Sequence, residues 1–286
     1  MRTKKGYTPS SIMIKSINQW AFSPDRSLAE VFAMARDLGF EAIEVTIDEK
    51  GELTPQTSAD ECARIAGEAA KAGVALSGLA SGFGWGHPMT CADESVRKRG
   101  IELNKGALRI AKNLGIDAIL VVPGGVGADF IPDFQGAPYD VAYQNAFDAL
   151  QELAPVAEEL GVTIGVENVW NMFLLSPLEM RDFLDKIGSP RVKSYFDVGN
   201  VVATGYPQQW ISILGERIAR VHFKDFKRDI ATIDGFCDLL EGDTDYAAVM
   251  NQLRAVGYDG PVAAEFFDVE DDLPKISAAM DRILKL

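Results

Sequence analysis

The chain has the length and composition of one globular domain. Its 286 residues are 47% hydrophobic, and 42 acidic against 28 basic side chains give a net charge of −14 at pH 7. A single α/β barrel commonly needs about this length. The acidic balance argues against a nucleic-acid partner, because such binding depends on Lys and Arg at phosphates. No apolar run approaches the roughly 20 residues of a membrane-spanning helix, so we expect no membrane partner.

Cysteine usage and the start of the chain predict a cytoplasmic protein. Cys62, Cys91 and Cys237 are widely separated, odd in number and without a CxxC pair. Isolated cysteines of this kind are typical of free thiols in a reducing compartment. The first residues, MRTKKGYTPSSIM, include basic side chains but lack the apolar segment of a signal peptide. We interpret residues 1–10 as an N-terminal tail.

A unit made of an amphipathic helix, a glycine and a short apolar strand recurs along the chain. Clear copies are ARDLGFEAIEVTI, AAKAGVALSGLA, AKNLGIDAILVV, AEELGVTIGVEN and LRAVGYDGPVAAEF. The glycines at these and two looser joints suit the left-handed residue that ends a helix. They are Gly39, Gly73, Gly115, Gly161, Gly188, Gly215 and Gly257. With a first strand near 12–17, the seven joints predict eight strands.

The pattern of helices and strands predicts a single TIM barrel. Apolar residues recur at helical spacing over 93–114 and 139–160. The strands are continuous apolar runs, as expected for parallel strands covered on both sides. Strands that alternate with helices indicate βαβ units. An open doubly wound sheet is the alternative, but eight regular units without a break favour one (β/α)8 barrel over 1–286.

Four polar residues close the apolar runs in the second half of the chain. Glu167, Asp197, His222 and Glu265 end TIGVEN, KSYFDVGN, ARVHFKD and VAAEFF, the predicted fifth to eighth strands. Side chains at the C-terminal ends of barrel strands converge on the active site, so we expect these four to meet. Three carboxylates and one imidazole suit one divalent cation, Mn²⁺ first and Mg²⁺ or Co²⁺ as alternatives, better than a structural zinc.

The segments VENVWN, YFDVGN, VHFKD, LLEGDTDY and GPVAAEFF resemble the sugar isomerase/epimerase superfamily with the xylose-isomerase-like barrel. That group includes ketohexose and pentulose-5-phosphate 3-epimerases, hydroxypyruvate isomerase and inosose dehydratase. The resemblance extends from the first strand to the last helix. It implies that Glu167, Asp197, His222 and Glu265 are the metal ligands. It also implies that Glu167 and Glu265 are catalytic and move protons on opposite faces of a ketose.

The implied chemistry is proton transfer at C3 through a metal-bound enediolate. General acid–base catalysis contributes about 10²–10⁴-fold, which falls short of a typical enzymatic rate enhancement. A divalent cation supplies a further electrostatic contribution by stabilising the developing charge. Return of the proton to C3 from the other face is epimerisation, and return to the neighbouring carbon is aldose–ketose isomerisation. Both reactions are carried out by isomerases, so we predict an isomerase that acts on a sugar or sugar phosphate.

Five residues are candidates for substrate binding. Arg228 lies six residues after His222, where the ketose epimerases carry an arginine for the substrate end next to the carbonyl. Asn200 stands in DVGN, a sequence of the pentulose-phosphate branch, where ketohexose epimerases often have a histidine. His87 can touch a substrate oxygen or phosphate, and Trp20 and Trp170 can form apolar walls. A solvated charge, an ordinary loop histidine and barrel packing are the alternative interpretations.

Supporting roles are predicted for several neighbours of the ligands. Glu44 ends the second strand at the same mouth, where it orients a water or hydroxyl or is a plain rim acid. Lys224 and Asp225 follow His222 directly and are interpreted as supports that orient it. Residues 226–243 form an inserted active-site loop that 241–243 close, with Thr244 or Asp243 capping the next helix.

Three other functions are weighed against the epimerase. A lyase on the same scaffold, inosose dehydratase-like or a C-glycoside-cleaving subunit, needs only a leaving group on the substrate. A DNA-repair endonuclease with the related barrel needs several histidines and a basic groove, which two histidines and a charge of −14 oppose. A purely sugar-binding role is opposed by the intact ligand set. Relatives are often dimers or tetramers, and a homo-oligomer is therefore expected.

The presence of a phosphate on the substrate is left open by the sequence. The acidic FFDVEDD after the last strand should repel a phosphate, although barrel phosphate sites often lie nearby. Lys227, Arg228, His87 or the glycines of VVPGGVGADF are the candidates for binding one elsewhere.

Overall fold

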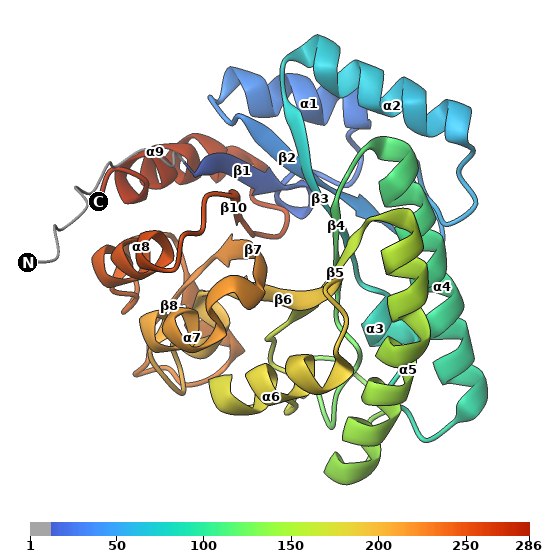
Figure 1. Ribbon diagram of the computed structural model, residues 1–286. Helices are drawn as coiled ribbons and strands as arrows, with labels where there is room; N and C mark the ends of the chain where they lie inside the picture. The colour runs from blue at the N-terminus through green and yellow to red at the C-terminus, as the bar shows by residue number, and fades with distance from the viewer. Residues whose placement is uncertain (1–12) are drawn as a thin grey trace, which may run out of the picture.

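The computed structural model describes residues 13–286, so the predicted tail 1–10 and the predicted strand start at position 12 lie outside the described residues. Eight parallel strands close into a barrel in the order β1-β10-β7-β6-β5-β4-β3-β2, with the helices outside (Figure 1). The strands are β1 (Ile14–Asn18), β2 (Ala42–Ile47), β3 (Ala75–Ser81), β4 (Ala118–Val121), β5 (Thr163–Glu167), β6 (Val192–Asp197), β7 (Ile218–Phe223) and β10 (Pro261–Ala264). The predicted (β/α)8 TIM barrel is confirmed.

Helices cover the barrel and alternate with its strands. They are α1 (Leu28–Asp37), α2 (Ala59–Ala72), α3 (Phe83–Gly86), α4 (Glu94–Leu114), α5 (Tyr139–Leu160), α6 (Pro177–Ile187), α7 (Pro207–Leu214), α8 (Tyr246–Ala255) and α9 (Leu273–Ile283). The helices predicted over 93–114 and 139–160 are confirmed as α4 and α5. The short α3 lies at the end of β3, inside a segment that the sequence analysis treated only as a loop.

Local side chains and glycines define the helix ends. Ser58, Asp93 and Ser176 accept N–H groups of the first turns of α2, α4 and α6. All seven glycines predicted at the joints have positive φ, the backbone region that favours glycine. Gly215 differs from the expected left-handed helical residue, because its ψ of −127° lies outside that region.

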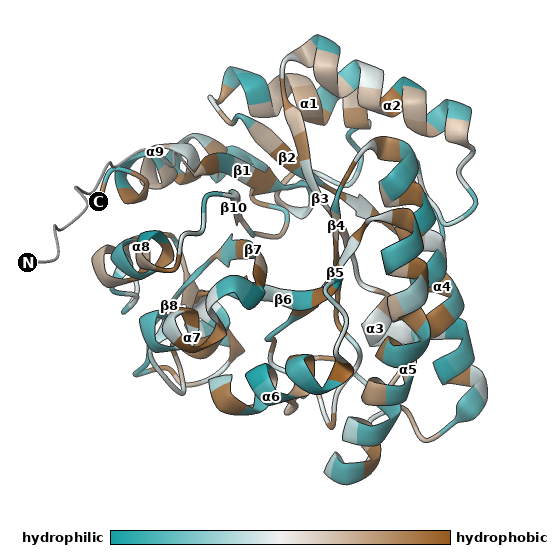
Figure 2. Cartoon of the chain, in the orientation of Figure 1, coloured by the Kyte–Doolittle hydropathy of each residue, from teal (hydrophilic) through white to brown (hydrophobic). Residues whose placement is uncertain are grey.

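The core lies between the strands and the surrounding helices. Large side chains such as Phe32, Phe183 and Phe223 are fully buried there. The helices carry hydrophilic and hydrophobic residues on different sides, and the strands are predominantly apolar (Figure 2). Burial of these apolar faces stabilises the barrel. It also fixes the strand ends relative to one another, which positions the side chains at the mouth.

The long segment after β7 folds as a hairpin at the mouth of the barrel. β8 (Asp225–Phe226) pairs antiparallel with β9 (Phe236–Cys237), so that Asp225 lies opposite Cys237. This hairpin corresponds to the predicted inserted loop 226–243. It returns the chain to α8, which begins after Asp245 rather than after Thr244 or Asp243. The side chain of Asp245 accepts the N–H of Ala248 and caps the helix in their place.

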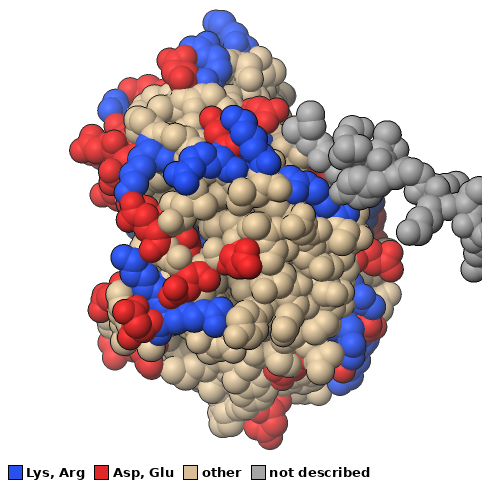
Figure 3. Space-filling model, turned by 90° about the vertical axis from the view of Figure 1, so that its left-hand side faces the viewer, with Lys and Arg blue, Asp and Glu red and all other residues tan. Residues whose placement is uncertain are grey.

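Surface charge, helix composition and cysteine state were compared with the features expected from the sequence. On the face seen in Figure 3, lysines and arginines form a row across the upper part, with aspartates and glutamates beside it. Within residues 13–286, none of the helices combines the length and the apolarity needed to cross a bilayer. All three cysteines are free, as predicted.

Candidate metal centre and active site

The four candidate metal ligands come together at the C-terminal mouth of the barrel. Glu167 and Asp197 are the last residues of β5 and β6, His222 is the penultimate residue of β7, and Glu265 directly follows β10. The parallel register places Asp197 beside His222, and His222 beside Ala263. One ligand atom from each of the four residues lies within 4.8 Å of all the others. The expected convergence is therefore observed.

The converging atoms are buried and lack well-aligned hydrogen-bond partners. They are Glu167 Oε1, Asp197 Oδ2, His222 Nδ1 and Glu265 Oε2. His222 Nδ1 lies 2.6 Å from Glu265 Oε2, 3.6 Å from Glu167 Oε1 and 3.9 Å from Asp197 Oδ2. Buried carboxylate oxygens are costly unless they are paired or coordinate a metal. The donor set therefore fits one divalent cation, bound by three carboxylates and one imidazole.

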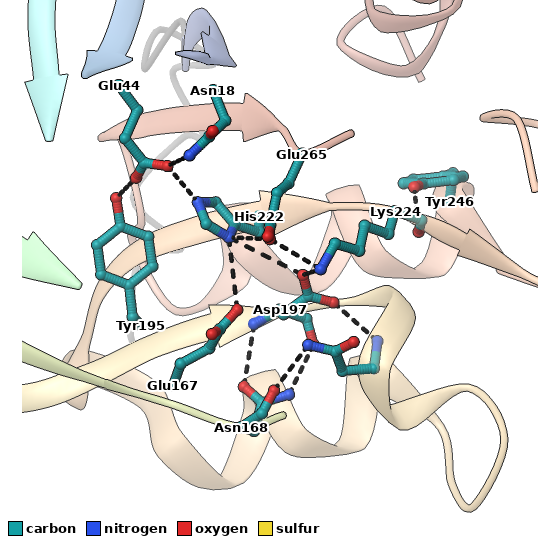
Figure 4. Close-up of polar contacts among 11 residues, drawn as sticks. Asn18, Glu44, Glu167, Asn168, Tyr195, Asp197, His222, Lys224, Tyr246 and Glu265 are labelled. Carbon is teal, nitrogen blue, oxygen red and sulfur yellow. Dashed lines mark hydrogen bonds and ion pairs between the residues drawn. The ribbon is translucent and has the colours of Figure 1, made fainter. Parts of the chain in front are cut away.

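Glu44 orients the imidazole from inside the barrel. Its Oε2 lies 2.8 Å from His222 Nε2, on the side of the ring opposite Nδ1 (Figure 4). Metal-ligating histidines commonly donate their second ring N–H to a carboxylate, which fixes the tautomer. Glu44 is fully buried and also accepts hydrogen bonds from Asn18 Nδ2 and Tyr195 OH. Both interpretations of Glu44 as a mouth residue were wrong, because it lies below the ligands within β2.

Two glycines make room for the Tyr195 ring in the barrel interior. A Cβ at Gly165 would lie 2.5 Å from Tyr195 Cδ2, and a Cβ at Gly78 would lie 2.7 Å from the Tyr195 hydroxyl. The ring packs edge-on against His222, with centroids 4.9 Å apart. Tyr195 therefore supports both the imidazole and Glu44, a role that the sequence analysis missed.

Two asparagines hold Asp197, Asn168 by its backbone and Asn200 by its carboxylate. Asn168 accepts the Asp197 N–H at 3.0 Å and donates to the Asp197 carbonyl at 2.8 Å. The backbone N–H of Asn200 donates to Asp197 Oδ1 at 2.7 Å, while Oδ2 remains directed at the ligand cluster. The Asn200 side chain donates to the Asn168 carbonyl at 3.0 Å. These bonds fix one oxygen of Asp197 and leave the other to coordinate an ion.

Lys224 reaches into the same cluster from the end of β7. Its Nζ lies 2.9 Å from Glu265 Oε2 and 3.4 Å from Asp197 Oδ2. Lys224 therefore touches two ligands directly, although the sequence analysis assigned it only to the support of His222. The lysine adds a positive charge on the cavity side of the carboxylates.

The acidic cluster shifts the pKa values of its members in opposite directions. Burial, followed by the charge of Glu265, raises the pKa of Glu167 to about 7. Burial also acts to raise the pKa of Glu265, but the charges of Lys224 and His222 outweigh it and hold that pKa well below the ordinary value. Burial opposes the charged form of His222, yet the surrounding carboxylates, Glu44 foremost, raise its pKa well above the usual range. The two glutamates therefore differ in their affinity for a proton.

A cavity of about 810 Å³ opens above the cluster, lined by residues of β2, β3, β4 and β5 and of the segments that follow β1, β6, β7 and β10. Glu167, Glu265 and Lys224 form part of its floor, and the hairpin β8–β9 forms part of its wall. Pockets of this size enclose small-molecule ligands, and the mouth of a TIM barrel is where catalytic groups gather. Titratable groups, a buried set of four residues that could hold a cation and a ligand-sized cavity are thus combined in one place.

The family model of the xylose isomerase-like TIM barrel matches residues 32–286. The chain belongs to this family. The predicted resemblance is confirmed.

Curated relatives of this xylose isomerase-like barrel include L-ribulose-5-phosphate 3-epimerase UlaE of Salmonella heidelberg (strain SL476). The two are 25% identical over 260 residues, which are 87% of this chain and 85% of the relative. An uncharacterised protein of Methanocaldococcus jannaschii is 27% identical over 185 residues, 63% of this chain but only 60% of that protein. The relative with a named activity is a sugar epimerase, and epimerases are isomerases.

Solved structures with the same fold include further epimerases. D-psicose 3-epimerase from Clostridium cellulolyticum H10 superposes with a TM-score of 0.79 at 17% identity, covering 95% of this chain and 98% of that one. The 3-keto-D-glucoside 4-epimerase YcjR of E. coli has a TM-score of 0.77 at 16% identity and covers 96% and 100%. At these identities the likeness demonstrates the fold. The curated relative with a named activity agrees with the predicted enzyme class, an isomerase.

The predicted substrate-binding residues of this family member divide into two groups. Trp20, Trp170 and Asn200 line the cavity. Arg228 and His87 are absent from its lining, contrary to the expectation. Arg228 donates to the Gly205 carbonyl and lies over the Tyr206 ring, 4.8 Å from its centroid. His87 pairs with Glu49 at 2.8 Å.

Asp225 organises the hairpin and does not orient His222, so the predicted role of Asp225 was wrong. Its carboxylate accepts four backbone N–H groups, from Phe226, Leu240, Gly242 and Thr244, at 2.9 to 3.1 Å. It is fully buried. The hydrogen bonds tie the start of the loop to its return, which holds the cavity wall in place.

Proposed function

We propose that this chain is a divalent-metal-dependent sugar epimerase that transfers a proton at C3 of a ketose. The observation that carries the proposal is the placement of Glu167 and Glu265. Both line the cavity, and both present buried oxygens without a well-aligned hydrogen bond to the same cluster. They come from β5 and β10, which β6 and β7 separate in the barrel. Two carboxylates on different sides of one substrate position are what inversion by proton removal and return requires.

Some residues of the site transfer protons, and others hold the site in place. One glutamate removes the C3 proton and the other delivers a proton to the opposite face, which inverts that carbon. Glu44 and the asparagine pair keep His222 and Asp197 in place.

Glu167, Asp197, His222 and Glu265 would hold the divalent ion. When bound, the ion supplies electrostatic stabilisation of the negative charge that develops beside the substrate carbonyl. We propose Mn²⁺ as the natural ion, with Mg²⁺ or Co²⁺ as alternatives. A cytoplasmic location and a homodimer or homotetramer stay predictions.

Solvent exchange tests the proposal. The Mn²⁺-loaded protein is incubated with a panel of ketoses in D₂O, and NMR measures deuterium at C3 together with inversion. Glu167→Gln and Glu265→Gln should each lower the exchange rate by about 10²-fold or more, because each removes a proton carrier. Glu159→Gln, an exposed change of the same kind on α5, is the matched control.

Two outcomes would contradict the proposal. One is deuterium at a carbon other than C3, or loss of a substituent from the sugar, which would favour the isomerase or the lyase. The other is full activity in both glutamine variants while Mn²⁺ stays bound.

A further inference from the structure

The outer part of the cavity is built from apolar and aromatic side chains. We define the apolar collar as Trp85, Phe130, Ile131, Ile233, Phe236 and Phe267, all of which line the cavity. They come from α3, the β4–α5 loop, the hairpin loop and the segment after β10. Phe130, Ile233 and Phe267 are 37%, 42% and 60% exposed. Large exposed apolar groups gathered around a cavity indicate a binding surface for an apolar group.

The collar continues into the aromatic walls nearer the ligand cluster. Trp20 stacks on Phe267 with ring centroids 5.5 Å apart, and Trp85 meets Phe130 edge-on at 5.3 Å. Trp170 packs against Phe236 at 5.5 Å. Three aromatic pairs therefore line the cavity around and above the acidic floor. A flat ring placed there would stack against similar rings.

The charges in the cavity oppose a phosphate. Within residues 13–286, Lys224 is the single cationic side chain in the lining, and its ammonium is held between Glu265 and Asp197. Asp48 and Asp238 add two further carboxylates to the wall. A phosphate dianion placed beyond the floor would face these acids without a cation of its own.

The groups that could have bound a phosphate lie outside the cavity lining, and several are bonded to other residues. The N–H of Gly125 donates to Thr90, and those of Val126 and Gly127 donate to the Asn171 carbonyl. Arg228 and His87 bind Gly205 and Glu49, and neither they nor Lys227 line the cavity. The structure thus provides an apolar surface where a sugar-phosphate enzyme would need donors.

We infer that the substrate is a ketose carrying an uncharged, ring-containing apolar group at the end remote from the reacting carbon. The inference rests on the proposed function and narrows its substrate class. The sugar lies over Glu167 and Glu265, and the attached ring occupies the apolar collar. A cavity of about 810 Å³ accommodates both parts, because pockets for drug-sized ligands span about 300–1,000 Å³.

Binding of unreactive analogues tests the inference independently of turnover. Ribitol, ribitol 5-phosphate and 5-O-benzylribitol lack the carbonyl and differ only at one end. Calorimetry on the Mn²⁺-loaded full chain should show 5-O-benzylribitol binding about tenfold or more tighter than ribitol, through burial of the ring. Ribitol 5-phosphate should bind more weakly than ribitol.

Turnover of the matching ketoses gives the second readout. We expect kcat/KM, measured as C3 deuterium exchange, to be highest for 5-O-benzyl-L-ribulose, then L-ribulose, then L-ribulose 5-phosphate. Exchange of L-ribulose without any benzyl preference would overturn this inference and leave the proposed function standing. Preferential binding of 5-O-benzylribitol without deuterium exchange in any ketose would support the inference and contradict the proposed function. Preference for the phosphate in either assay overturns the inference.

A matched pair of variants locates the ring. Ile233 lines the cavity, whereas Ile230, in the same loop and 41% exposed, does not. Ile233→Ala should lower the affinity ratio of 5-O-benzylribitol over ribitol about threefold or more, and Ile230→Ala should keep it. Suppose that Ile233→Ala leaves the affinity ratio of 5-O-benzylribitol over ribitol unchanged but changes the oligomeric state, as measured by light scattering. The collar would then be a contact between subunits. That result would overturn the proposal.

Discussion

At the scale of single residues, the contact between Glu44 and His222 fixes the orientation of the imidazole in the site. One carboxylate receives three donors, from Asn18, Tyr195 and His222. An ionised carboxylate accepts all three, whereas a carboxamide offers one acceptor and adds two donors. Glu44 therefore fixes the imidazole only while it stays a carboxylate.

Replacing Glu44 by Gln should weaken Mn²⁺ binding by about 10–100-fold, because the imidazole loses the acceptor that orients it. Calorimetric titration with Mn²⁺ measures the effect. Glu159→Gln serves as control and should bind like the parent protein. Unchanged affinity in Glu44→Gln would show that the His222–Glu44 contact does not support the metal site.

Metal affinity should increase with pH around neutrality. Glu167 in the metal-free protein has a pKa of about 7, so it holds a proton below that pH and must lose it to bind a cation. The raised pKa of His222 acts in the same direction, since Nδ1 must also be deprotonated. Each proton released makes the apparent affinity about tenfold stronger per pH unit.

Titrations with Mn²⁺ between pH 6 and 8, repeated in buffers of different ionisation enthalpy, count the protons released. Affinity that is flat across this range would contradict the expected proton release.

At the scale of elements, the hairpin after β7 depends on one buried carboxylate. Asp225→Ala should destabilise the protein by about 2–4 kcal/mol, because it leaves buried backbone N–H groups without their charged acceptor. Amide exchange should accelerate over 226–244, measured by mass spectrometry. Asp229→Ala, an exposed change in the same loop, should do neither. Protected amides in Asp225→Ala would refute the role of Asp225.

The sequence predicted elements better than contacts. Periodic apolar residues and joint glycines located α4, α5 and the strands, because local patterns decide where helices end. The same strand ends located Glu167, Asp197, His222 and Glu265. Arg228 was assigned by its spacing from His222, yet the hairpin directs its side chain to Gly205 and Tyr206. Side-chain direction in a loop depends on tertiary contacts that spacing does not encode.

The barrel-interior partners were missed for a related reason. Tyr195 and Asn18 look like ordinary strand residues, and only the closed barrel brings them to Glu44. Gly78 and Gly165 were a usable signal, since small residues inside a strand often mark a close approach.

For the molecule as a whole, the proposed metal site links the ends of four strands that are separate in the chain. A ligand that binds only the folded state stabilises it by about 2.7 kcal/mol at 100 times its Kd. Saturating Mn²⁺ should therefore raise the Tm by several degrees, as measured by scanning calorimetry, and EDTA should reverse the rise. Glu265→Gln should lose most of this shift. An identical Tm with and without Mn²⁺ would contradict a site shared by β5, β6, β7 and β10.

Anomalous diffraction from crystals of the Mn²⁺-loaded protein tests the central claim most directly. We expect one manganese peak, about 2.0–2.3 Å from Glu167 Oε1, Asp197 Oδ2, His222 Nδ1 and Glu265 Oε2. A manganese peak elsewhere, or four well-ordered side chains with no manganese peak between them, would contradict the claim.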